Sequence, residues 1–124
     1  MLSLPPSTLI YLATVPVDLR TSFDALSGLI LSLFGLDPLC GHLFVFFNKR
    51  QDLVKILFWD RTGFVLYAKK LAQGRFHFHK YAENGETKCT LEAAELFLVL
   101  EGLDLSEAKR CKRWRPPLIN VPSK

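Results

Sequence analysis

The hydrophobic and polar positions at the start of the chain predict a strand followed by a helix. Residues 9–17 mix β-branched, aromatic and small side chains, and Pro16 lies near their end, which is typical of a strand. From Thr21, which can cap a helix, apolar residues return at helical spacing and share one face. Gly35 can end this helix, so we predict it over residues 21–34. Its apolar residues are Phe23, Leu26, Ile30, Leu33 and Phe34.

Four short strands are predicted next, at residues 42–48, 53–59, 64–70 and 75–79. The first is apolar on both faces, which favours a central position covered on both sides. Short turns separate the four runs, so we expect an antiparallel meander, because a parallel crossover needs a dozen or more residues. The last run alternates, with Phe76 and Phe78 facing inward and Arg75, His77 and His79 facing outward.

A second helix is predicted from Thr90, as its cap, to the neighbourhood of Gly102. Residues 106–111 can form a short helical turn, and a Pro-Pro pair at 116–117 prevents its continuation. The order of elements predicts an α+β fold: a two-layer domain in which an antiparallel β-meander of about four to five strands packs with two helices. We expect one domain over residues 1–108 and a basic, flexible C-terminal tail over residues 109–124.

Composition fits this picture and reveals an uneven charge. A chain of 124 residues that is 49% hydrophobic can form one core without a disulfide or metal, and it is not intrinsically disordered. The net charge of +4 hides four blocks. The charge is −2 over residues 1–41, +6 over 42–80, −6 over 81–108 and +6 over 109–124. A functional hypothesis must therefore explain two strongly basic segments.

Cysteine usage and the uncharged segments bear on the compartment. Cys40, Cys89 and Cys111 are odd in number and far apart, which favours a reducing environment. Residues 1–17 carry no charged side chain, but they lack a basic start and are interrupted by two prolines, unlike a signal peptide. The uncharged run 25–36 is too short to span a bilayer. We expect a cytoplasmic protein with no membrane partner.

The strongest chemical signal is a basic run that contains one indole. Lysine and arginine neutralise phosphates, and tryptophan can stack on a base or wedge into a groove. The run comprises Lys109, Arg110, Lys112, Arg113, Trp114 and Arg115. A solvated terminal tail is the alternative interpretation. The cluster Lys69, Lys70 and Arg75 is a second candidate, for which protection of a sheet edge is the alternative.

Two further kinds of site are less favoured by the pattern. His77 and His79 face the same way and could bind a metal with a third ligand such as His42, Cys89 or Glu83, but exposed strand histidines without a metal are commoner. The carboxylates Asp18, Asp60 and Glu92 could hold two Mg²⁺ ions, yet they suit turns and a helix start better. No catalytic or nucleotide-binding motif occurs. We therefore predict no catalytic residues, no metal, no cofactor and no small-molecule substrate.

A set of eight fragments in register carries a family resemblance. The fragments are residues 10–14, 16–20, 22–24, 41–46, 55–60, 63–67, 69–71 and 74–76. Together they resemble the TnpB accessory proteins of the insertion sequence 66 family of bacterial transposable elements, over about residues 3–105. The resemblance implies a role in transposition beside a separate transposase that carries the acidic catalytic residues. Thr21, Phe47 and Leu105 depart from the family pattern, the first two where basic residues are common.

The resemblance adds Arg20, which lies in a matched fragment as Arg75 does, to the candidate side chains. The alternative for Arg20 is pairing with Asp18 or Asp24. Our leading hypothesis is an accessory protein of transposition that contacts DNA at the transposon ends without catalysis and assists the transposase. The alternative is a module that binds the transposase, or forms a homo-oligomer through its oppositely charged segments, without contacting DNA. The nucleic-acid-binding candidates are Arg20, Lys69, Lys70, Arg75, Lys109, Arg110, Lys112, Arg113, Trp114 and Arg115.

Overall fold

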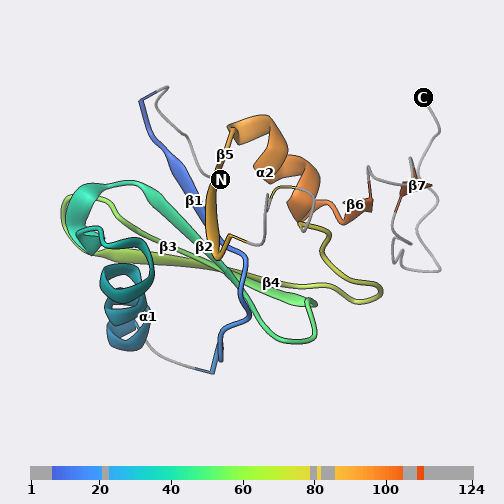
Figure 1. Cartoon of the computed structure of the whole chain (residues 1–124), viewed down its shortest axis with the longest axis horizontal. Helices are drawn as coiled ribbons and strands as arrows, with labels where there is room; N and C mark the ends of the chain where they lie inside the picture. Colours follow the sequence, from blue (N-terminus) through green and yellow to red (C-terminus); the bar gives the residue numbers. More distant parts are fainter. Residues whose placement is uncertain (1–6, 21–22, 79–80, 82–85, 105–108, 111–124) are drawn as a thin grey trace.

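A five-stranded mixed sheet organises the molecule, in the order β4-β3-β2-β1-β5 (Figure 1). The computed structural model describes residues 7–20, 23–78, 81, 86–104 and 109–110. The strands of the sheet are β1 (Ile10–Ala13), β2 (Leu43–Phe47), β3 (Leu53–Trp59), β4 (Phe64–Lys70) and β5 (Lys88–Leu91).

The antiparallel meander β2-β3-β4 is confirmed, and two side chains shape its turns. The side-chain oxygen of Asn48 accepts hydrogen bonds from the backbone N–H groups of Asp52 and Leu53, both at 3.1 Å. In the second turn, Asp60 Oδ1 accepts from the backbone N–H groups of Thr62 at 3.2 Å and Gly63 at 3.1 Å. Asparagine and aspartate commonly form such local bonds, so both turns follow from the sequence.

The first strand takes a position that the meander alone does not dictate. β1 lies between β2, to which it is parallel, and β5, to which it is antiparallel. The connection from β1 to β2 passes through α1 (Phe23–Leu29), a π-helical turn η1 (Ile30–Phe34) and a 3₁₀ turn η2 (Pro38–Cys40). A connection of that length permits a parallel crossover. Gly35 ends the helix with φ of 66°, as predicted.

The fourth strand of the predicted meander is wrong. Residues 75–78 are not a strand, and the fifth strand is β5, which includes Thr90. Phe76 and Phe78 are nevertheless buried, as their alternation predicted. Phe78 stacks on Phe47 with ring centroids 4.3 Å apart, and the N–H of Phe76 donates to the carbonyl of Gln51 at 2.7 Å. Side-chain packing rather than a strand ladder therefore holds this segment.

The second helix, α2 (Ala93–Leu100), also begins differently from the prediction. Its N-cap is Glu92 and not Thr90, because Thr90 pairs with β1 as part of β5. The backbone N–H of Glu92 donates to Glu95 Oε1 at 2.8 Å, which is one half of a capping box. Gly102, at φ of 75°, follows the end of the helix as predicted.

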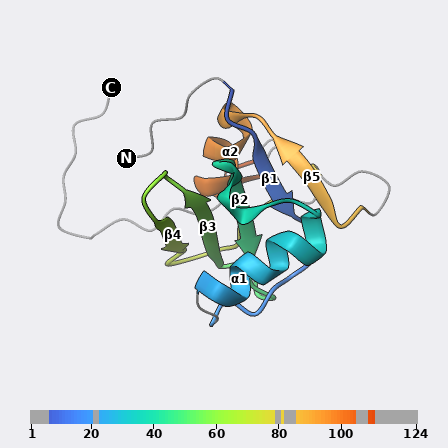
Figure 2. The same cartoon turned by 90° about the vertical axis from the view of Figure 1, so that its left-hand side faces the viewer.

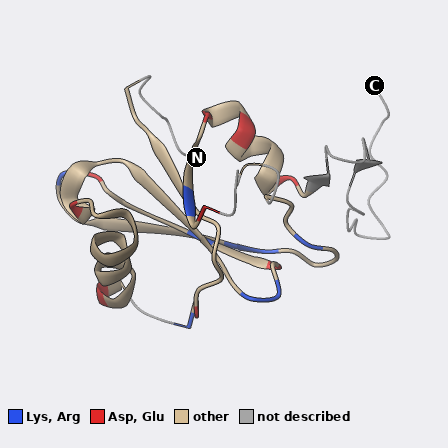
Figure 3. Cartoon of the chain, viewed as in Figure 1, with Lys and Arg blue, Asp and Glu red and all other residues tan. Residues whose placement is uncertain are grey.

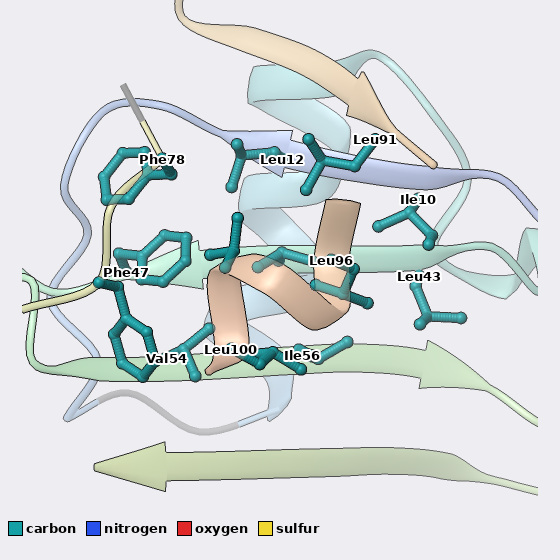
Figure 4. Packing of buried hydrophobic residues seen from close by; sticks show 13 residues of the cluster. Ile10, Leu12, Leu43, Phe47, Val54, Ile56, Phe78, Leu91, Leu96 and Leu100 are labelled. Atoms are coloured by element: carbon teal, nitrogen blue, oxygen red, sulfur yellow. The ribbon is translucent and has the colours of Figure 1, made fainter. Parts of the chain in front are cut away.

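The helices cover opposite faces of the sheet, which confirms the α+β class but makes three layers where two were expected (Figure 2). On one face, Leu26 and Ile30 of the first helix pack against Phe44 and Phe46 of β2. On the other face, Leu96 and Leu100 of α2 lie over β1, β2 and β3 (Figure 4). Every residue of β2 is buried, so its predicted central position is confirmed.

A short pair of strands follows α2. β6 (Leu103–Asp104) pairs in antiparallel fashion with β7 (Lys109–Arg110). The helical turn predicted over 106–111 is therefore wrong at 109–110, and its other residues lie outside the described part of the chain. The domain boundary after residue 108 stays a prediction. Among the described residues, none of the helices has the length and apolarity that crossing a membrane requires.

Candidate nucleic-acid interface

One end of the sheet gathers five basic residues from four segments of the chain. We call this surface the basic end, and it comprises Arg20, Lys49, Arg50, Lys70 and Arg75. Lys70 ends β4 opposite Leu53, the first residue of β3, so it lies beside the turn that carries Lys49 and Arg50. In Figure 3 the basic segments at the β2–β3 turn, at the end of β4 and in the following loop lie toward the same end of the sheet.

Backbone hydrogen bonds connect the remaining segments to this end. The N–H of Leu71 donates to Asp52 at 2.8 Å and that of Phe76 to Gln51 at 2.7 Å, which places Arg75 against the same turn. The N–H of Val17 donates to Phe47 at 2.9 Å, which brings Arg20 to the end of β2. Alternate turns of a meander lie at opposite ends of the sheet, so Arg61, in the β3–β4 turn, lies at the far end.

The ammonium group of Lys69 makes a hydrogen bond that links β4 to α2. Its Nζ donates to the carbonyl of Leu100 at 2.8 Å, at the C-terminus of α2. The last carbonyls of a helix lack intrahelical donors and attract cations. Lys88 makes a similar bond to Leu33 at 3.1 Å, in η1. The structure therefore gives Lys69 a tertiary role that the sequence alone did not predict.

Arg20 pairs with Asp18, which was the alternative that the sequence left open. Its Nε donates to Asp18 Oδ1 at 3.0 Å and its Nη2 to Oδ2 at 2.9 Å. These hydrogen bonds, with one from the Arg20 backbone N–H, lower the pKa of Asp18 to about 2, and Asp18 raises the pKa of Arg20. The Arg20 side chain is 90% exposed and the Asp18 side chain 56% exposed, so solvent reaches both partners.

A groove of about 450 Å³ lies at the basic end, between residues 16–20 and the β2–β3 turn. Its basic residues are Arg20, Lys49 and Arg50, and Asp18 is its acidic residue. The remaining lining residues are Pro16, Val17, Leu19, Asn48 and Leu53. A second hollow, of about 590 Å³, lies on the other side of residues 16–18 against the first helix. Lys49 and Arg50 were not among the predicted site residues, although their place in the first turn of the meander was a usable signal.

The C-terminal candidates remain predictions. Lys109 and Arg110 form β7 through their backbones. Lys112, Arg113, Trp114 and Arg115 lie outside the described residues.

The carboxylates considered for catalysis do not come together. Asp18 lies beside the start of β3 and Asp60 follows its last residue, so the length of a seven-residue strand separates them, roughly 20 Å. Glu92 caps α2. Hydrogen bonds from the backbone and side chain of Thr62 lower the pKa of Asp60, which has the turn-forming role expected for it. Within the described residues, which include His77 and not His79, there is no group of three metal-ligating side chains.

Comparison with known proteins identifies relatives over most of the chain. A family model described as IS66 Orf2 like protein matches residues 8–110. The uncharacterized protein y4jC of Sinorhizobium fredii is 36% identical over 110 residues, which cover 89% of this chain and 92% of that protein. The uncharacterized protein y4hO of the same organism is 32% identical over 110 residues, or 89% of this chain and 91% of that protein. No solved structure matches the chain.

Proposed function

Because the chain belongs to the IS66 Orf2-like family, which implies an accessory role in transposition, we propose that it assists a transposase by contacting DNA without catalysis. The contact is made by the basic end of the sheet. The partners of the protein are the DNA of the transposon ends, contacted at its phosphates, and the transposase of the same element. We further propose that the basic C-terminal tail contacts the same DNA.

The observation that supports this proposal is the gathering of Arg20, Lys49, Arg50, Lys70 and Arg75 at one end of the sheet. These residues come from four segments, so their proximity results from the fold and not from a local run of charge. Asp18 and Asp52 are the acidic residues of the same segments, which leaves the surface strongly basic. A basic surface formed in this way neutralises backbone phosphates and releases counterions.

The test is a binding titration with a duplex of the element's terminal sequence at several salt concentrations. Each phosphate contact should contribute about −0.9 to the slope of log K against log salt. The double variant Lys70→Ala with Arg75→Ala should weaken binding and reduce the slope. Arg61→Asn is the control for position, because it removes a cation at the far end of the sheet and asparagine tolerates the φ of 85° found there. Absent or salt-independent binding would refute the proposal.

The contribution of the tail is measured separately. A chain that ends at residue 110 keeps the β6–β7 pair and the whole segment matched by the family model. If the tail supplies most of the non-specific affinity, this truncation should abolish most binding to a mixed-sequence duplex. An unchanged affinity would assign the binding to the basic end alone.

A second candidate function, docking on the transposase, is supported by apolar exposure beside the first helix. On the first helix, Phe23 is 43% exposed and Leu31 59% exposed, and a hollow against the same helix is lined by Ala25, Leu29 and Leu33. Co-purification with the transposase that survives nuclease treatment and is lost in the variant Leu31→Glu would favour this function. Co-purification that nuclease abolishes would favour bridging by DNA.

A further inference from the structure

The geometry of the Asp18–Arg20 pair leaves one edge of the guanidinium directed away from the carboxylate. Asp18 occupies the side formed by Nε and Nη2. An arginine side chain has five N–H donors in a rigid planar fork, so Nη1 and the second N–H of Nη2 form another pair of parallel donors. Parallel N–H donors match two oxygens of a phosphate in bidentate fashion. The pair can therefore hold a second anion at its outer edge.

The backbone that carries this pair is anchored on both sides of Asp18. The N–H of Val17 donates to the carbonyl of Phe47 at 2.9 Å. The carbonyl of Leu19 accepts from Lys55 Nζ, and the Leu19 side chain is buried. Asp18 Oδ1 also accepts from the backbone N–H of Arg20 at 3.0 Å. Arg20 is thus oriented by a carboxylate that is itself held in place.

The opposite wall of the groove is a turn with its own internal hydrogen bonds. Asn48 donates from Nδ2 to Asp52 at 2.7 Å and accepts from the backbone of Asp52 and Leu53. Lys49 and Arg50 project from this turn and line the groove with Arg20. With three cations and one carboxylate, the lining has a net charge of plus two, which favours an anionic ligand.

We propose that this groove is a subsite for one phosphodiester of the DNA backbone, in which Arg20 binds the phosphate, Lys49 and Arg50 support it, and Asp18 is the positioning residue for Arg20. The proposal rests on the proposed function, since it assumes that the basic end contacts nucleic acid. At such exposure an ion pair contributes little stability, so orientation of the guanidinium is the main consequence of the pair.

The decisive measurement is the direction in which Asp18→Asn changes the affinity for a duplex. Removal of a carboxylate from a basic surface should strengthen phosphate binding if Asp18 acts only through its charge. If Asp18 positions Arg20, the same variant should weaken binding about threefold to tenfold, because the oriented fork is lost. Asp37→Asn is the matched control: it removes a carboxylate from the cap of η2, at the far end of the sheet, where asparagine can also cap.

Two further readouts separate positioning from a merely structural effect. Arg20→Lys keeps the charge but not the fork, so it should weaken binding to a similar extent as Asp18→Asn. Combined with Asp18→Asn, it should cause little additional loss, since both changes remove the same interaction. The NMR signal of the Arg20 Nε–H should shift when a dinucleoside monophosphate is added to the wild-type chain, and less so in the Asp18→Asn variant.

The outcomes distinguish this proposal from the proposed function. No binding of the wild-type chain to duplex would overturn both. Binding that weakens in Lys70→Ala but strengthens or stays unchanged in Asp18→Asn would overturn only the subsite, as would an unchanged affinity in Arg20→Lys. Weaker binding in Asp18→Asn and Arg20→Lys, with unchanged thermal unfolding and an unaffected Asp37→Asn control, would support the subsite.

Discussion

Two adjacent lysines at the end of β4 should have different roles, although the sequence does not distinguish them. Lys69 donates to the carbonyl of Leu100 at 2.8 Å, whereas Lys70 is exposed at the basic end. Substitution of each by methionine removes the same charge and keeps a side chain of similar length. Lys69→Met should therefore reduce stability and leave DNA binding nearly unchanged. Lys70→Met should weaken DNA binding and leave stability nearly unchanged.

The magnitude for Lys69 follows from the lost bond. A hydrogen bond from a charged group contributes about 1.5–3 kcal/mol when it is well shielded, and a cation at a helix C-terminus about 0.3–1 kcal/mol. Because Lys69 is only partly buried, we expect a loss below the range for a shielded bond and at the upper end of the range for a helix C-terminus, about 1 kcal/mol. Lys70→Met, as a surface change, should stay within about 0.5 kcal/mol. In a chain of this size, a loss of 1 kcal/mol lowers Tm by about 3–5 °C.

The assay pairs urea unfolding with the salt dependence of duplex binding for both variants. Lys70→Met should reduce the steepness of the slope of log K against log salt by about 0.9, the contribution of one phosphate contact. Lys69→Met should leave the slope unchanged. Equal losses of stability in the two variants would refute the tertiary role of Lys69, and a reduced slope in Lys69→Met alone would refute the assignment of Lys70 to the interface.

Three further predictions concern the core, the first helix and Asp18. Phe78→Ala should cost about 3–5 kcal/mol in urea unfolding, because Phe78 is buried and stacks on Phe47; a cost below 1 kcal/mol would contradict the packing described. Gly28→Ala should stabilise the protein by about 0.5–1 kcal/mol, because a Cβ at Gly28 points into open space and alanine favours a helix. Gly35→Ala should destabilise it by about 1–2 kcal/mol, because Gly35 has a φ of 66°. Effects of the same sign in urea unfolding would contradict these assignments. Since its pKa is lowered to about 2, Asp18 should contribute stability above about pH 4 that is lost as the pH falls toward 2; an NMR titration midpoint near 4 would argue against the pair with Arg20.

The candidate site could be predicted from the sequence only in part. Three of the five residues of the basic end, Arg20, Lys70 and Arg75, were identified, and pairing of Arg20 with Asp18 was one of the stated alternatives. Their grouping was not predicted, because it depends on which turns lie at the same end of the sheet. The role of Lys69 was also missed, since the carbonyl that it binds belongs to α2, far away in the sequence.

Local patterns alone determined the two hairpins of the meander, the two helices and the inward direction of Phe76 and Phe78, because alternation and helical spacing report which side chains are buried. Tertiary structure decided the neighbours. β1 entered the sheet between β2 and β5, which are distant in the chain, and residues 75–78 packed without forming a strand. Burial depends on side chains that the sequence shows directly, whereas strand partners and the basic end depend on contacts between remote segments, which no local pattern specifies.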